Sequence, residues 1–300
     1  MVVKMDSFKK ISLDLSFLVN IAIASAKIKK LVVEEKHKRY NMRPVIHIIL
    51  HAPVGQIKST ILNEISDITK TSVITEATKA GLVGTLDNKT MQIIAGAAWE
   101  CRNSLLLLDE FNFGRKKEGW EVFLQLLEHQ KWGKRIGMFG ADQNISDEDL
   151  YFKTGKGRID LKTRFSAIIA TMRKFESQRS QGFRAFASRC IPMHFDLSEN
   201  DMKRILEGES LFKYKNLPVK EEVSITGKTY RKIKNKVLKE LKTCCPAENV
   251  RKEIIMRSVG DCCRAYAVLS KNDKNYIKKI VNWKAETQQL IGKYFMKVKK

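Results

Sequence analysis

A run of four leucines, Leu105–Leu108, directly precedes the paired carboxylates Asp109 and Glu110. A short, continuous apolar run is typical of a strand that is buried on both faces, as strands are in a parallel sheet. Carboxylates at the end of such a strand usually bind a cation. The alternative is that Asp109 caps the N-terminus of a helix. We therefore expect an α/β fold in which one buried strand carries a cation site at its carboxyl end.

A second apolar run, Pro44–Leu50, leads into the loop Ala52–Ser59, whose sequence is APVGQIKS. The loop is similar to the phosphate-binding pattern G-x-x-x-x-G-K-[ST], in which backbone amides and the lysine take up phosphate charge. Ala52 and Ile57 replace both signature glycines, whereas Gly55 and the final Lys-Ser remain. Glycine matters where the backbone must approach a phosphate or adopt a positive φ angle. An ordinary strand–turn–helix with a chance lysine is the alternative interpretation.

The two patterns together predict a site for a nucleoside triphosphate and its magnesium ion. Lys58 would neutralise the phosphates. Ser59 and Asp109 would hold the metal, and Glu110 would polarise the attacking water. The residues expected to surround the phosphates are Pro53, Val54, Gly55, Gln56, Ile57, Lys58, Ser59 and Thr60. The expected cofactors are therefore ATP and Mg²⁺.

Three more short apolar runs are expected to form strands, with helical patterns between them. The five expected strands are Pro44–Leu50, Thr71–Thr75, Leu105–Leu108, Phe165–Thr171 and Cys190–Phe195. Strands that alternate with helices, here Ser59–Ile68 and Trp120–His129, form a mostly parallel sheet that is covered on both faces. After residue 197 the pattern becomes helical, over Asp201–Leu206, Lys228–Leu241, Arg251–Leu269 and Tyr276–Phe295, with one short strand at Glu222–Thr226. We expect a helical extension over 1–43, an α/β core over 44–197 and a smaller helical domain over 198–300.

Several segments resemble the core of the AAA+ ATPases, and among these the MCM-type replicative helicases and their MoxR-like relatives. The segments are Ala80–Thr85, Ala95–Trp99, Asn103–Phe111 and Leu126–Gln130, within a resemblance that extends over 44–269. The resemblance implies a P-loop NTPase αβα sandwich with a five-stranded sheet, followed by a smaller helical lid domain. It also implies a homo-oligomer, a hexameric ring that binds ATP between subunits.

The same resemblance implies roles for further residues. The fourth strand should end in a polar sensor of the γ-phosphate, for which Thr171 and Arg173 are equal candidates. Arg189 would reach the site of the neighbouring subunit as a finger arginine, which acts in trans. Arg257 fits the arginine of the lid helix, and Arg264 lies two turns later on the same face. A plain core strand and a surface arginine are the alternatives.

The chain carries a formal net charge of +23. A basic excess of this size indicates an anionic partner, most often nucleic acid, although a lysine-rich surface also aids solubility. In MCM-type proteins a β-hairpin in the region that corresponds to Lys131–Arg164 contacts DNA, and a solvated loop is the alternative. The candidate DNA-binding residues are Lys131, Lys134, Arg135, Lys156 and Arg158, interleaved with Trp132, Phe139, Tyr151 and Phe152. The basic stretch Lys228–Lys242 is more typical of a solvated helix face.

These features favour an ATP hydrolase that assembles into a ring and acts on DNA, as an MCM-like helicase or translocase in replication. A MoxR-like protein remodeller would have the same fold and site but a protein substrate. A DNA-binding or structural protein with little or no hydrolysis is the third hypothesis, and the missing loop glycines together with Arg173 favour it. The intact Lys-Ser and Asp-Glu pairs oppose it.

The six cysteines show no CxxC spacing and the histidines complete no zinc pattern, so we expect buried, reduced thiols. No run of about 18 uncharged apolar residues occurs, so we expect no membrane span and a cytoplasmic location. Residues 1–43 are few beside the large N-terminal domain of MCM-type helicases. We therefore expect a compact motor module, of a kind plausible in viruses, plasmids or other mobile elements.

Overall fold

The computed structural model describes residues 7–36, 38–53, 55–75, 78–87, 89–90, 92–109, 117–135, 142–155, 157–171, 181–245, 248–269 and 275–297. At its centre lies a five-stranded, all-parallel sheet in the order β13-β3-β12-β7-β4. The strands are β3 (Ile48–His51), β4 (Val73–Ile74), β7 (Ser104–Leu108), β12 (Phe165–Thr171) and β13 (Ile191–His194). Each of the five expected runs supplies one strand, so the predicted parallel sheet is confirmed.

Successive residues of these strands pack on opposite faces of the sheet. Leu105 and Leu107 belong to a hydrophobic cluster that includes α1 (Ser7–Ala26) and α2 (Lys58–Thr69). Leu106 and Leu108 belong to a second cluster on the other face. The second cluster includes α3 (Lys79–Val83), α4 (Ala97–Glu100), α5 (Lys117–His129) and α6 (Gln181–Arg189). The strands are therefore buried on both faces, which explains why the sequence shows continuous apolar runs there.

The N-terminal part differs from the helical extension that the sequence predicts for 1–43. Among the described residues of this part only α1 is helical, because β1 (Lys30–Glu35) and β2 (Lys38–Met42) form an antiparallel hairpin. β1 also pairs in parallel with β14 (Glu222–Ile225), which gives a three-stranded sheet in the order β14-β1-β2. Leu31 and Val33 are buried while Val32 between them is partly exposed. This alternation is that of a half-buried strand rather than a helix.

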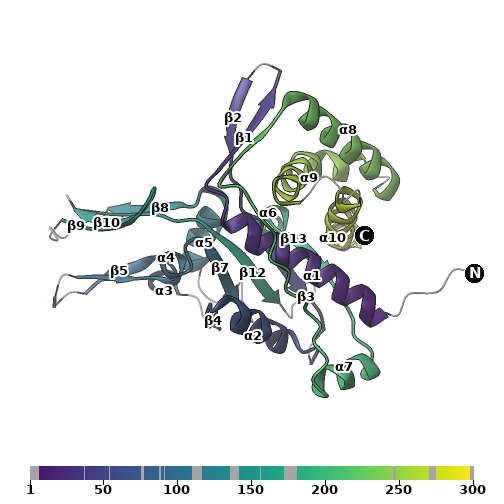
Figure 1. Cartoon of the computed structure of the whole chain (residues 1–300), viewed down its shortest axis with the longest axis horizontal. Helices are drawn as coiled ribbons and strands as arrows, with labels where there is room; N and C mark the ends of the chain where they lie inside the picture. The colour runs from purple at the N-terminus through teal and green to yellow at the C-terminus, as the bar shows by residue number, and fades with distance from the viewer. Residues whose placement is uncertain are drawn as a thin grey trace, which may run out of the picture.

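The helices expected after residue 197 are confirmed. They are α7 (Glu199–Leu206), α8 (Gly227–Cys244), α9 (Glu248–Val268) and α10 (Tyr276–Lys297), and the expected short strand is β14. The last three helices pack on one another, and α9 also packs on α1 (Figure 1). Ile168 of the sheet and Tyr230 and Ile280 of the helices belong to one hydrophobic cluster. The helical part therefore shares its core with the sheet across the expected boundary at residue 197.

Two antiparallel elements project from the same side of the central sheet (Figure 1). One is the hairpin of β5 (Gly84–Leu86) and β6 (Ile93–Ala95). The other is a sheet in the order β8-β11-β10-β9, made of β8 (Lys131–Arg135), β9 (Gln143–Asp147), β10 (Leu150–Gly155) and β11 (Arg158–Lys162). The basic stretch thus forms four strands where the sequence predicts one hairpin. Gly84 has a φ of +91° and lies so near the ring of Phe152 that any side chain there would collide with it.

All six cysteines are reduced and five of them are buried, as expected. Burial raises the pKa of Cys101, Cys190 and Cys263 to about 12, which keeps these thiols protonated at neutral pH. No helix within the described ranges is long and apolar enough to cross a membrane. Across the same residues, His, Cys, Asp and Glu side chains do not gather in groups of three or more that would hold a metal ion.

Candidate functional site

The carboxyl ends of β3, β12 and β7 lie at one edge of the central sheet, which we call the carboxyl edge. β12 lies between the other two strands, with Thr171 level with His51 of β3 and Ile169 level with Leu108 of β7. Neighbouring strands lie about 4.8 Å apart, so the ends of β3 and β7 are separated by about 10 Å. The lysine loop follows β3 and Asp109 follows β7. The two motifs of the sequence therefore meet at one edge, with the end of β12 between them.

The backbone of the lysine loop has the positive φ angles that are typical of an anion-binding nest. Gly55 has a φ of 80° and Ile57 a φ of 50°, whereas Gln56 between them and Lys58 after them do not have positive φ angles. Alternation of left- and right-handed conformations points successive N–H groups to the same side, which creates a concavity for anions. Ile57 adopts the left-handed conformation that glycine would adopt without strain, at a cost of about 1–2 kcal/mol.

Lys58 is the first residue of α2, and its side chain folds back into the loop. Its exposed fraction is 6%, and its Nζ donates hydrogen bonds to the carbonyl oxygens of Ala52 at 3.0 Å and Pro53 at 2.7 Å. These bonds hold the ammonium group inside the curve of the loop, beside the nest. Ser59 and Thr60 follow in the first turn of α2 and are exposed. A phosphate bound in the nest would thus meet the lysine and the positive end of the helix.

Gln56 fixes the loop to a distant segment, a role that the loop pattern alone did not assign. Its Nε2 donates to the carbonyl oxygen of Leu197 at 3.1 Å, and its Oε1 accepts from the Leu197 N–H at 2.6 Å. Its side chain is buried and is bonded to the segment after β13. Gln56 therefore positions the phosphate loop through its side chain.

The second half of the site begins with Asp109. This carboxylate residue is 7% exposed, and its backbone N–H donates to the carbonyl oxygen of Ile74 at 2.9 Å, which fixes it against the end of β4. Thr171 is buried at the end of β12, so one of the two candidate sensors lies between the loop and Asp109. Val54, Glu110 and Arg173, which also have predicted roles, lie outside the described residues.

Two histidines, His51 and His194, support the strand that enters the loop, and no local sequence pattern indicates this role. His194, which ends β13, has its Nδ1 2.9 Å from Nδ1 of His51 and its Nε2 2.9 Å from Oγ1 of Thr287 in α10. Burial, together with the neighbouring His51, lowers the pKa of His194 to about 4, so the imidazole is neutral at neutral pH. These contacts connect the end of β3, directly before the phosphate loop, with a C-terminal helix.

Arg189 and Arg257, the two arginines with predicted roles at a nucleotide, lie together on another part of the molecule. Both form ion pairs with Glu128 of α5, Arg257 at 2.9 Å. Leu127, next to Glu128, accepts a hydrogen bond from His47 directly before β3, so this group lies at the amino edge of the sheet. The structure therefore does not bring either arginine to the lysine loop of its own chain.

The amino edge also holds a buried ionic cluster. Asp261 of α9 pairs with Lys284 of α10 and with Arg264, each at 2.6 Å. Lys284 also donates to the carbonyl oxygen of Cys190, and Arg264 to that of Arg43. Burial alone would raise the pKa of Asp261, but the two cations hold it below its ordinary value. The cluster attaches α9 and α10 to the segments that precede β13 and β3.

The four-stranded sheet has one basic face. Arg135 lies directly opposite Arg158, and Lys131 directly opposite Lys162, so these side chains share a face with Lys153 of the next strand. We call these five residues the basic sheet face; all but Lys162 are exposed. Asp160 lies on the same face and pairs with Arg158 at 2.7 Å, and Lys162 pairs with Asp149 at 2.9 Å. Lys131, Arg135 and Lys153 therefore supply the excess charge that a bound anion would offset. Lys134 is exposed but lies on the opposite face, and Lys156 lies outside the described residues.

The aromatic residues of this stretch do not match the expectation of bases stacked on them. Trp132 and Phe152 are buried on the apolar face of the four-stranded sheet. Tyr151 is partly buried on the basic sheet face, where Nζ of Lys153 lies 4.6 Å from its ring centroid. Phe139 lies outside the described residues. Among the described aromatic residues of the stretch, only Tyr151 is therefore positioned to meet a ligand on the basic sheet face.

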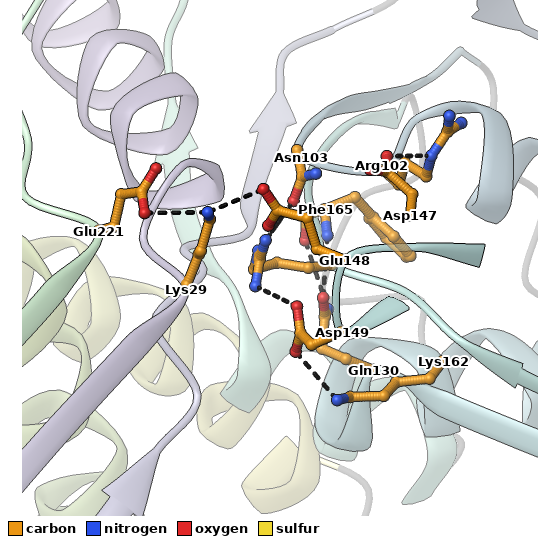
Figure 2. A network of polar contacts seen from close by, with 11 residues as sticks. Lys29, Arg102, Asn103, Gln130, Asp147, Glu148, Asp149, Lys162, Phe165 and Glu221 are labelled. Atoms are coloured by element: carbon orange, nitrogen blue, oxygen red, sulfur yellow. Dashed lines mark hydrogen bonds and ion pairs between the residues drawn. The ribbon is translucent and has the colours of Figure 1, made fainter. Parts of the chain in front are cut away.

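A polar network attaches the four-stranded sheet to the core, as Figure 2 shows. Arg164, which precedes β12, donates to Oδ1 of Asn103 at 2.9 and 2.5 Å and pairs with Asp149 at 3.4 Å. Asn103 lies just before β7, and Asp149 lies in the turn between β9 and β10. Nearby, Glu148 pairs with Lys29 at 2.9 Å. Arg164 is thus a structural residue rather than a free basic group of the loop.

No protein-family model matches the chain, and no curated protein matches it. What the carboxyl edge can do follows from its own groups. It combines an anion nest, a buried lysine, two exposed hydroxyl side chains and a carboxylate that follows the strand two places away in the sheet. Such a set can take a polyphosphate on one side and a divalent cation between the hydroxyl and the carboxylate.

Proposed function

We propose that this chain binds and hydrolyses ATP as an AAA+ protein of the MCM-like group. The observation that carries the proposal is the meeting of the lysine loop and Asp109 at one edge of a parallel sheet, separated by a single strand. Lys58 neutralises phosphate charge while the loop N–H groups hold the phosphate oxygens. Thr171 lies where a sensor of the γ-phosphate is needed.

The oxygen donors at this edge fit Mg²⁺. Ser59 offers a hydroxyl and Asp109 a carboxylate, and magnesium prefers such hard oxygen ligands while it keeps water and phosphate oxygens in its remaining positions. When bound, the ion would supply positive charge against the developing charge on the phosphates. Glu110, the next residue after Asp109, would accept a proton from the attacking water.

The shared location of Arg189 and Arg257 favours an oligomeric ring. Both arginines lie at the amino edge, opposite the lysine loop of their own chain. A neighbouring subunit would therefore receive them, where an arginine stabilises the charge on the transferred phosphoryl group. Glu128 would release them when the subunits meet.

The basic sheet face favours DNA as the substrate of the motor. Its four exposed cations, Lys131, Arg135, Lys153 and Arg158, lie on a sheet that Arg164 attaches to the amino ends of two core strands. Cations arranged in this way neutralise phosphates and release counterions. Nucleotide-dependent movement of the core strands would be transmitted to this face.

The test of the catalytic part is phosphate release from ATP in the presence of Mg²⁺, with and without DNA. We expect hydrolysis by the wild type and a loss of about 100-fold or more in Lys58→Ala and in Glu110→Gln. Lys239→Ala, which removes an exposed lysine of α8, is the control and should hydrolyse ATP normally. A wild type without hydrolysis, or unchanged hydrolysis in both site variants, would refute the catalytic proposal.

One observation favours a second candidate, a nucleotide-binding AAA+ protein with little turnover. Ile57 carries a β-branched side chain in a conformation that suits glycine, so the loop holds strain in a place that must approach a phosphate. Tight ATP binding without phosphate release would support this candidate. A MoxR-like remodeller of proteins is a further alternative, which hydrolysis that is indifferent to DNA at every salt concentration would favour.

A further inference from the structure

A groove lies between the β1–β2 hairpin and the start of α8. Figure 1 shows the hairpin beside the first turns of this helix. The groove has a volume of about 1010 Å³. Glu34, Glu35 and Lys38 are among the residues that line it from the hairpin, and Lys228 and Arg231 are among those from the helix. It is thus large enough for a ligand of substantial size.

The lining of this groove is strongly basic. Its cations are Lys36, Lys38, Arg39, Lys228, Arg231 and Lys234, against the two acids Glu34 and Glu35. Both acids are already paired, Glu34 with Arg39 at 2.9 Å and Glu35 with Lys234 at 3.0 Å. Among the described residues, the other four cations form no ion pair with an acid. The groove therefore has an excess of four positive charges on two facing walls.

The helix adds to this positive potential. α8 has 18 residues, and its N-cap Thr226 and first residues Gly227 and Lys228 line the groove. The N-terminal end of a helix carries a partial positive charge and N–H groups that bind phosphates. Apart from Gly227, every described residue of the lining is charged or polar, so these residues offer no apolar anchor of the kind that holds peptides. A ligand would be recognised by its charge and hydrogen bonds.

We propose that this groove, the hairpin–helix groove, binds the phosphodiester backbone of a nucleic acid. It would give the chain a second nucleic-acid contact, separate from the basic sheet face and independent of ATP hydrolysis. The proposal extends the proposed action on DNA, and it also explains the role of the first part of the basic stretch Lys228–Lys242. Lys232, Lys239 and Lys242 of the same helix are exposed but do not line the groove.

The experiment compares two triple variants that each remove three positive charges, one from the two walls of the groove and one from exposed positions of α8 outside it. The groove variant is Lys38→Gln/Lys228→Gln/Arg231→Gln, and the control is Lys232→Gln/Lys239→Gln/Lys242→Gln. Binding of fluorescein-labelled DNA of about 20 nucleotides, single-stranded and duplex, is measured by anisotropy without ATP across a series of salt concentrations. Melting temperatures verify that both variants are folded.

We expect the groove variant to bind DNA about 10-fold or more weakly at 0.1 M salt, with a salt dependence reduced by about two to three units of slope. The control should lose less than about 3-fold. Equal losses in both variants, or no loss in the groove variant, would overturn the proposal. Competition by poly-glutamate as strong as that by DNA at equal charge would also overturn it, in favour of an acidic protein partner.

A third variant separates this proposal from the proposed function. Arg135→Gln/Lys153→Gln/Arg158→Gln removes three charges from the basic sheet face and leaves the hairpin–helix groove intact. If only this variant loses DNA binding, the groove proposal fails and the action on DNA stands. A photocrosslinking side chain at Asn235, which lines the groove, gives an independent measurement because it should form adducts with bound DNA. Absence of adducts in the wild-type background would count against the groove.

Discussion

The two edges of the central sheet use their polar residues in opposite ways. At the amino edge, Asp261, Lys284 and Arg264 are buried and satisfy one another's charge at 2.6 Å. At the carboxyl edge, Lys58 is held by the carbonyl groups of a loop that bends into an anion nest, and the hydroxyl of Ser59 is exposed. The comparison indicates that the amino edge holds the helices to the sheet, whereas the carboxyl edge keeps its donors arranged for a ligand.

The largest effect is expected from Asp261→Ala at the amino edge. The substitution leaves Lys284 and Arg264 buried without the carboxylate that compensates their charge, and loss of one partner of a buried pair costs about 3–5 kcal/mol of unfolding free energy. Urea unfolding measures this change. Glu248→Ala, which removes an exposed pair with Lys252, is the matched control and should cost less than about 0.5 kcal/mol. Similar losses in the two variants would contradict the structural role of the amino edge.

The second prediction concerns the histidines of the carboxyl edge. The pKa of His194 is about 4 in the folded chain and 6.5 ordinarily, so between these pH values the unfolded chain binds more protons. Stability should therefore fall as the pH decreases through this window, by an amount on the order of 3 kcal/mol from this residue.

Urea unfolding of the wild type and of His194→Gln at several pH values between 7.5 and 4.5 tests this prediction. His47 also has a lowered pKa because it is buried and lies near Arg43, and it remains in both proteins. The difference between the two pH profiles therefore isolates His194. Parallel profiles would show that its contacts with His51 and Thr287 do not keep it neutral.

A smaller effect is expected from Gln56→Ala. This substitution removes two hydrogen bonds to the backbone of Leu197, each worth about 0.5–1.5 kcal/mol, and lets the phosphate loop move. We expect the Kd for ATP to rise about 10-fold, measured with a fluorescent nucleotide. Gln125→Ala, at an exposed position of α5, should leave the Kd unchanged. An equal Kd in the wild type and Gln56→Ala would show that the loop keeps its shape without this support.

The central sheet could be predicted from the sequence because each of its strands is buried on both faces. Such strands require apolar residues at every position, and Leu105–Leu108 and Phe165–Thr171 show this directly. The lysine loop and the acidic strand end could also be located, since their chemistry depends on residues that are close in the sequence. Their meeting at one edge follows from the parallel arrangement of the strands.

The remaining features depend on partners that are distant in the sequence. Gln56 and Leu197 are 141 residues apart, and His51 and His194 are 143 residues apart, so no local pattern reveals either contact. The strands at 30–42 have no clear local pattern because β2 is polar and almost wholly exposed, and β1 completes its sheet with the distant β14. The number of strands in the four-stranded sheet could not be predicted from the sequence. In β8, for example, only Trp132 is buried, so the residues do not alternate clearly between apolar and polar.

The pairing of β1 with β14 has a consequence for synthesis of the chain. Lys30–Val33 leave the ribosome long before their partners Glu222–Ile225. At usual translation rates this delay is on the order of 10–40 s, during which one edge of β1 has no neighbour and the apolar side chains of Leu31 and Val33 lack their final cover. A nascent or prematurely terminated chain would expose this strand to association with other chains. Yield in a recombinant host should therefore increase when slower growth and added chaperones protect the incomplete polypeptide.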